Sequence, residues 1–234
     1  MSNKEHSEVD KLTLGYFGEY QVNIDMGELS LTFLDELANI FEQSLQRFPD
    51  CYVFRFRLGF PKTFNGDAEA LLNTLFYSLA NQFPEKAITE GELKSKGNTK
   101  PVNEDVNMIW AKDVTAKGLL GYRVAFIFSA VSYRAKASLE QVREHFKQRV
   151  KITWANALLV HESQIHTLCI FPPDSLIPLK AEQSNYQYET HRCFYFLSTL
   201  AKLPRYPVED LSTAFGVKFS KQQNQDKKEL IEQS

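Results

Sequence analysis

The stretch YVFRFRLGF at residues 52–60 decides the fold of this chain. Aromatic and leucine side chains occupy every second position, and this period of two is typical of a β-strand with one apolar face. The other face carries Arg55 and Arg57. The strand that builds the core therefore also carries positive charge to the opposite side of its sheet.

Strands and helices alternate on both sides of this stretch. Further strands are predicted at about residues 12–24, 106–113, 120–129 and 166–171, with a hairpin turn at Lys117-Gly118. Apolar residues three or four apart, with a Ser30 cap and a Ser138–Gln141 capping box, predict helices at about 30–48, 65–83, 138–154 and 189–203. This order predicts an α+β fold: a largely antiparallel sheet with helices on one face, plus an N-terminal strand-helix extension.

A sheet covered on one face leaves its second face available for a ligand. Five residues fall opposite the apolar rows of their strands: Arg55, Arg57, Gly121, Arg123 and Ala125. If the two strands pair so that these positions share a face, the sheet presents a basic platform.

Composition excludes several classes of protein. Of the 234 residues, 43% are hydrophobic and 24% charged, as in soluble globular domains. The cysteines Cys51, Cys169 and Cys193 include no CxxC pair, which argues against a disulfide scaffold or zinc ribbon and favours a reducing compartment. Because no apolar run reaches membrane-spanning length and the N-terminus is too polar for a signal peptide, we expect a cytoplasmic protein without membrane contact.

The formal net charge of −2 conceals a strong asymmetry along the chain. Residues 1–50 carry 3 basic and 10 acidic side chains, a net of −7, whereas residues 112–151 carry 9 and 3, a net of +6. Arg143, Lys147 and Lys151 line up at four-residue spacing within the basic stretch. Screening confines each charge to about 8–10 Å, so a local excess of this size can act on phosphates.

Three regions are predicted from these patterns. Residues 1–50 form an acidic N-terminal strand and helix extension, residues 51–219 the main domain, and residues 220–234 a polar tail predicted to be disordered. The acidic extension either docks on a protein partner or covers the basic region of its own chain.

Six motifs, in order, carry a resemblance to a known family: YVFRFRLGFP, ALLNTLFYSLANQF, IWAKD at 109–113, GYRV at 121–124, FYFLSTLAK and Phe215-Gly216. With them the chain from about Cys51 to Lys218 resembles the YagK/YfjJ C-terminal domain family of prophage proteins, which is related to inovirus replication proteins. That family is similar to HUH-type endonucleases, so the resemblance implies an HUH- or RRM-like sandwich encoded by a prophage or other mobile element.

The HUH chemistry that the resemblance implies needs particular residues. Two His at i and i+2 of one strand share a divalent ion, and a Tyr on a nearby helix attacks the phosphorus of single-stranded DNA, assisted by a Lys one turn on. Here the ligand positions hold Gly121 and Arg123, and the nucleophile position holds Thr199, while Lys202 remains. Neither glycine nor arginine offers a side-chain ligand. We therefore expect no nicking activity and no cofactor, with a divalent metal implied only if nicking survives.

Few residues can replace the missing groups. Tyr195 and Lys202 are the catalytic candidates, although a core aromatic is the interpretation we favour for Tyr195. Asp113 is the candidate metal ligand, but one carboxylate does not make a metal site. HESQIH at 161–166 lacks the HExxH spacing and favours a polar helix end.

Two functions from different classes follow. The first is a catalytically degenerate HUH-like protein that binds DNA, either single-stranded or duplex, in replication control or gene regulation. The second is a protein-interaction or regulatory module that keeps the fold without nucleic acid, with the acidic N-terminal region contacting the partner; an RRM-type RNA-binding sheet ranks last. The predicted nucleic-acid contacts are Arg55, Arg57, Arg123, Arg143, Lys147, Lys151 and Lys202.

Overall fold

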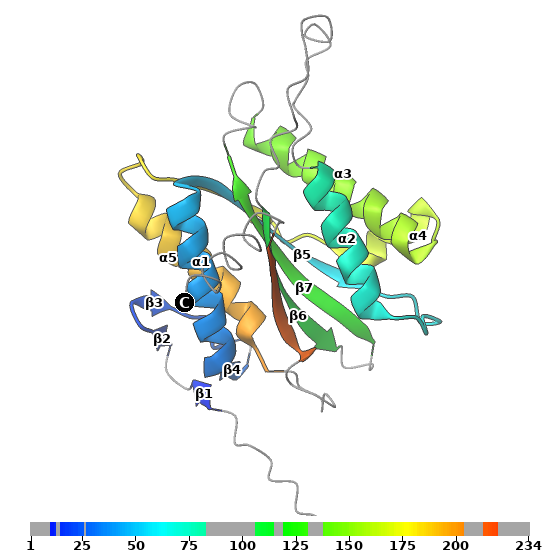
Figure 1. Ribbon diagram of the computed structural model, residues 1–234, viewed down its shortest axis with the longest axis horizontal. Helices are drawn as coiled ribbons and strands as arrows, with labels where there is room; N and C mark the ends of the chain where they lie inside the picture. The colour runs from blue at the N-terminus through cyan, green and yellow to red at the C-terminus, as the bar shows by residue number, and fades with distance from the viewer. Residues whose placement is uncertain are drawn as a thin grey trace, which may run out of the picture.

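The computed structural model describes residues 10–12, 15–25, 27–82, 106–114, 119–130, 138–203 and 213–219. Over these residues the chain forms one six-stranded antiparallel sheet with helices packed on both faces (Figure 1). The strands of the sheet are β5 (Asp50–Gly59), β6 (Val106–Val114), β7 (Leu120–Ser129), β8 (Cys169–Ile170), β9 (Leu176–Lys180) and β10 (Phe215–Phe219). The helices are α1 (Leu31–Arg47), α2 (Ala68–Gln82), α3 (Leu139–Leu158), α4 (Glu162–Leu168), α5 (Tyr186–Leu197) and the 3-10 helix η2 (Ser198–Ala201).

The strand order is β10-β6-β7-β5-β8, and β9 also pairs with β5. All of these pairings are antiparallel. The interior position of β5 fits its sequence. One face of the strand is apolar throughout, and the other face also carries two buried apolar side chains, Cys51 and Val53. Four two-residue strands precede α1: β1 (Lys11–Leu12), β2 (Tyr16–Phe17), β3 (Tyr20–Gln21) and β4 (Leu29–Ser30).

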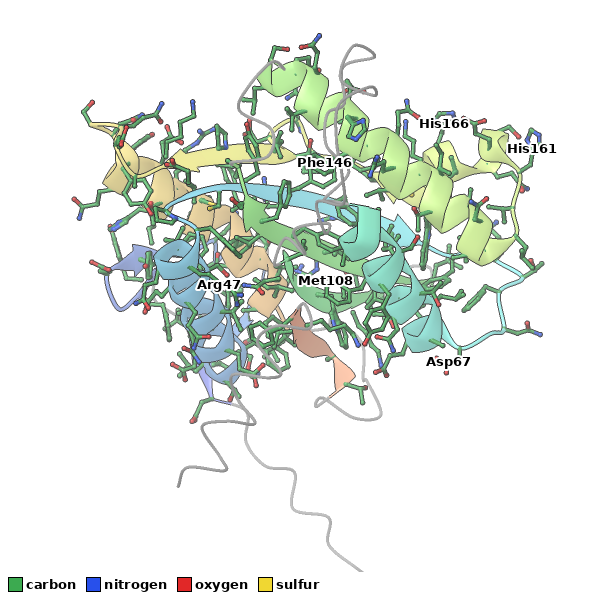
Figure 2. All side chains as sticks on the ribbon, turned by 45° about the horizontal axis from the view of Figure 1, so that its top comes forward. Arg47, Asp67, Met108, Phe146, His161 and His166 are labelled. Atoms are coloured by element: carbon green, nitrogen blue, oxygen red, sulfur yellow. The ribbon has the colours of Figure 1, made fainter. Side chains whose placement is uncertain are left out.

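The first face of the sheet packs against α2 and α3. Phe54 and Phe56 of β5 meet Phe126 of β7 and Phe146 of α3, with ring centroids 5.5 Å apart between Phe54 and Phe146. Figure 2 shows Phe146 directed from α3 toward the sheet. This core is the one that the alternation in residues 52–60 predicts.

The second face packs against α1 and α5, which corrects the expectation that helices cover one face only (Figure 1). Leu37 and Phe41 of α1 and Phe194 of α5 cover Val53 and Ile127 of the sheet. The apolar stripe of α1 is visible in the sequence, but the side of the sheet on which it docks is a tertiary property. The α+β class and the largely antiparallel sheet are confirmed.

The residues before position 50 belong to this second core. Asn107 of β6 donates a hydrogen bond of 2.7 Å to the buried Ser44 hydroxyl of α1. The main-chain amide of Asn23 donates to Ser198, and Leu29 forms a bridge with Lys202. The predicted domain boundary at residue 50 remains a prediction, but the described part of the extension shares its core with the sheet.

Local signals predicted several element ends correctly. Ser30 accepts from the amide of Phe33 at the start of α1, and Ser138 with Gln141 forms the predicted capping box of α3. The predicted strand at 166–171 is mostly wrong, because α4 runs to Leu168 and leaves only Cys169–Ile170 extended. The predicted last helix instead comprises α5 and η2, and the predicted strand at 12–24 is reduced to two-residue pieces.

Some predictions fall outside the described residues. The turn at Lys117-Gly118 and the tail at 220–234 are among them, although β6 and β7 pair antiparallel up to Val114 and Leu120. Within the part of the chain that the structure describes, no helix is long and apolar enough to cross a bilayer.

Candidate nucleic-acid interface

Strand register brings three arginines to one face of the sheet. Arg57 of β5 lies directly opposite Arg123 of β7, and Arg55 lies opposite Ala125. These side chains line a cavity of about 270 Å³ together with Phe196 of α5 and Thr199 of η2. The predicted shared face is therefore confirmed, but it is a cavity beneath α5 and η2 and not an open platform.

Arg123 is held deep in this cavity, with only 6% of the residue exposed. Its guanidinium donates to the main-chain oxygen of Thr199 and, at 3.5 Å, to that of Lys202, and Asp113 lies 3.8 Å from its Nε. Burial lowers the pKa of Arg123, Asp113 raises it and Arg57 lowers it. Arginine nevertheless keeps its charge at neutral pH, since its ordinary pKa is above 12.

Arg55 is anchored by a different part of the chain. Its guanidinium donates to the main-chain oxygens of Phe196 at 3.3 Å and Asp174 at 3.2 Å, and it lies 4.5 Å from the centroid of the Phe196 ring. Burial is the largest cause that lowers the pKa of Arg55, and Arg192 adds a smaller repulsive effect. The guanidinium is thereby held in one orientation at the cavity wall.

The arginines of the cavity differ in exposure and in hydrogen bonding. The Nε–H groups of Arg55 and Arg123 are buried and have no hydrogen-bond partner among the described residues. Arg57 is the most exposed of the three arginines. A fixed cationic cavity with unpaired donors is suited to an anion, because arginine binds phosphate and carboxylate through charge-assisted hydrogen bonds.

The positions that the resemblance assigns to metal ligands and nucleophile do not fit a metal: Arg123 and Thr199 line the arginine cavity, whereas Gly121 lines a neighbouring one. A Cβ on Gly121 would lie 2.7 Å from the main-chain oxygen of Leu58, so a side chain at that position has no space. Arg123 places a cation where the metal would sit. Among the described residues, no group of three or more His, Cys, Asp or Glu side chains could hold a metal ion.

The catalytic candidates occupy separate places. Thr199 and Phe196 line the arginine cavity, whereas Tyr195 does not, and its ring packs 5.8 Å from that of Phe196. The Lys202 side chain lies against Gly27 in the N-terminal region, with its Cε 2.8 Å from where a Cβ on Gly27 would be. Asp113 faces Arg123 as its ion-pair partner. The roles predicted for these residues remain predictions.

The basic row on α3 lies on the other side of the sheet from the arginine cavity (Figure 1). Arg143 pairs with Glu140 and donates to the main-chain oxygen of Pro173 at 3.0 Å. Lys147 lies 2.6 Å from Glu144, and the Lys151 ammonium lies 5.9 Å from the Phe171 ring centroid. Glu140 and Glu144 thus offset part of the predicted charge.

One short segment joins the two basic groups. Residues 171–174 run from the first core to the cavity: the main-chain oxygen of Pro173 accepts from Arg143, and that of Asp174 accepts from Arg55. The Asp174 carboxylate also lies 3.5 Å from Arg192. The sequence did not predict that this segment contacts both basic groups, because hydrogen bonds to main-chain oxygens do not depend on which side chains the segment carries.

The remaining sequence candidates lie elsewhere. His161 and His166 are exposed on α4 (Figure 2), and His161 caps that helix by accepting from the Ser163 amide, as a polar helix end predicts. All three cysteines are buried. Burial raises the pKa of Cys169 and Cys193 to about 12, so these thiols stay protonated and are poor nucleophiles.

The fold and this cavity define an α+β protein with a central antiparallel sheet and an arginine-lined cavity beside its last described helical segment. Residues 14–218 match the family model of the YagK/YfjJ C-terminal domain, and the chain belongs to that family. The match begins well before Cys51, in agreement with the packing of α1 into the second core. No curated protein and no solved structure matches the chain.

Proposed function

We propose that this protein binds DNA through the phosphate backbone and does not cleave it. The observation that carries the proposal is the convergence of Arg55, Arg57 and Arg123 on one cavity, at which the Arg57 side chain is exposed. The nicking machinery of HUH-like proteins is replaced here by fixed cations. By family resemblance, the setting we propose is a prophage or other mobile element, with a role in replication control or gene regulation.

Arg57 is the residue through which DNA first meets the cavity. Arg123 is buried and Arg55 is held by main-chain oxygens, whereas the Arg57 side chain is exposed. The α3 row contributes a second, weaker contact across the segment at residues 171–174. Phosphate contacts of this kind release counterions, so affinity falls steeply with salt.

The test is fluorescence anisotropy with labelled DNA of about 20 nucleotides, single-stranded and duplex, at about 50 and 200 mM salt. We expect Arg57→Glu to weaken binding about tenfold or more, since it reverses a charge beside two other cations. Lys180→Glu is the matched control: it makes the same charge change on exposed β9, outside the cavity, and should retain near-wild-type affinity.

Three results would overturn the proposal. The first is a wild-type protein that retains no DNA at low salt, which would favour the protein-interaction alternative. The second is equal loss of affinity in the Arg57→Glu and Lys180→Glu variants. The third is a nicked strand or a covalent DNA adduct when magnesium or manganese is added.

A further inference from the structure

A second and larger cavity, of about 770 Å³, lies at the end of the sheet and shares Arg57 and Ile170 with the arginine cavity. Its volume is within the range of small-molecule sites, about 300–1,000 Å³. The walls are mostly apolar and include Phe60, Tyr122 and Leu168. Arg57, Asp113 and Gly121 of this cavity belong to the positions discussed above, but its apolar walls have no role in the proposed phosphate contacts.

Two glycines that face each other across neighbouring strands form part of the cavity lining. Gly59 of β5 pairs with Gly121 of β7, and both line the cavity. With no side chain at either position, the floor stays at the level of the main chain, and Leu168 of α4 lies above Gly59. Trp154 of α3 donates to the main-chain oxygen of Gly59 at 3.0 Å and holds this floor in place.

A few polar groups project into these apolar walls. Arg57 and Lys62 supply positive charge, Gln164 supplies an amide that both donates and accepts, and Asp113 supplies a carboxylate. The Tyr122 hydroxyl is buried and has no hydrogen-bond partner among the described residues. The combination is suited to a planar, mostly apolar ligand with polar edges and one anionic group.

We propose that this cavity takes the base of a single nucleotide whose phosphate is bound by Arg57 at the entrance to the arginine cavity. The proposal rests on the proposed function for its phosphate site and adds the recognition of one unpaired base. The aromatic and apolar walls contact the faces of the base, and Gln164 and Asp113 form hydrogen bonds with the polar groups along its edge. A base that remains paired inside a duplex cannot enter.

The nucleotide has two possible sources, a bound single strand or a free mononucleotide. For the strand, affinities are compared for a mixed-sequence DNA of about 12 nucleotides and for a base-free sugar-phosphate strand of equal length. We expect the strand with bases to bind about tenfold more tightly, as stacking of one base supplies about 1–3 kcal/mol. Thr167→Phe, which fills the cavity, should abolish this preference, while His166→Phe on the exposed side of α4 should leave it intact.

For the free ligand, calorimetry compares the four deoxynucleoside monophosphates with deoxyribose phosphate. Tighter binding of a nucleotide, lost in Thr167→Phe and retained in His166→Phe, supports the mononucleotide source. A wild-type protein that binds both strands equally, and nucleotides no better than the sugar phosphate, overturns the inference but leaves the phosphate site standing. If neither strand binds, the proposed function fails, and the calorimetry alone decides whether the cavity takes a nucleotide.

Discussion

Arg123 of β7 donates a hydrogen bond to the main-chain oxygen of Thr199 in η2. By resemblance these two positions correspond to a metal ligand and a nucleophile, and here one is bonded directly to the backbone of the other. The contact joins the sheet to the helical segment that closes the cavity. In this chain the two positions form a structural contact that places a buried cation beside the cavity.

Replacing Arg123 is expected to cost stability. Arg123→Ala removes the donor to two part-buried main-chain oxygens and leaves Asp113 without its cation, so we expect a loss of about 3 kcal/mol in the free energy of unfolding. Urea denaturation measures it. Arg192→Ala, at a half-exposed arginine on α5, is the control and should cost less than about 1 kcal/mol; equal losses in the two variants would contradict the structural role of Arg123.

Gly121 cannot accept a side chain without displacing β5. Gly121→Ala places a Cβ against the main-chain oxygen of Leu58, and we expect it to destabilise the protein by about 2–3 kcal/mol. The Gly121→His, Arg123→His double variant should therefore not regain a metal site. Thermal unfolding with and without manganese checks both points, and a rise in Tm with the metal would refute the second.

The buried hydroxyl of Ser44 ties α1 to the sheet. Ser44→Ala removes the acceptor of Asn107 from a site without water access, and we expect a loss of about 1–3 kcal/mol. The Ser44 hydroxyl itself donates to the main-chain oxygen of Ile40. Thr74→Ala on α2 is a matched control, because the Thr74 hydroxyl likewise donates to the carbonyl four residues earlier but is exposed. The control should stay within about 0.5 kcal/mol, and a similar change in both variants would argue against a shared core.

Because of Tyr122, we expect the protein to lose stability at high pH. Burial, followed by Glu69 and Asp67, raises the pKa of Tyr122 from 10.0 to about 12. The folded state therefore holds this proton more tightly than the unfolded state, and the stabilisation is complete below pH 10 and lost as the pH rises toward 12.

Tyr122→Phe should raise stability at neutral pH by about 1 kcal/mol, because it removes a buried hydroxyl without a partner among the described residues. It should also reduce the loss of stability at high pH. Urea unfolding at several pH values measures both effects. Tyr188→Phe, at an exposed position, is the control, and an unchanged alkaline profile in Tyr122→Phe would contradict the assignment.

Local patterns in the sequence predicted the elements better than their assembly. The alternation in residues 52–60 and the Ser30 and Ser138 caps are short-range signals, and the structure confirms them. The pairing of Arg57 with Arg123 depends on the register of β5 and β7. The sequence does not determine that register, so the shared face could be predicted only on the condition that the strands pair in this way. The second helical layer was not foreseen, because an amphipathic helix such as α1 carries no information on which face of a sheet it covers.

The candidate site was predicted in composition but not in exposure. Counting charges along the sequence gives Arg123 the same weight as the basic row on α3. In the structure Arg123 is buried, whereas the α3 row lies on the other side of the sheet, beside Glu140 and Glu144. The pairing of Gly59 with Gly121 was likewise not foreseen as a cavity floor, because it depends on residues far apart in the chain.

Arg57 lines both cavities. A ligand that draws its guanidinium toward one cavity changes the charge available in the other. By thermodynamic linkage, the factor by which the first ligand alters the affinity of the second equals the factor by which the second alters the first. If both cavities bind ligands, we expect this single exposed side chain to couple them without any movement of the sheet.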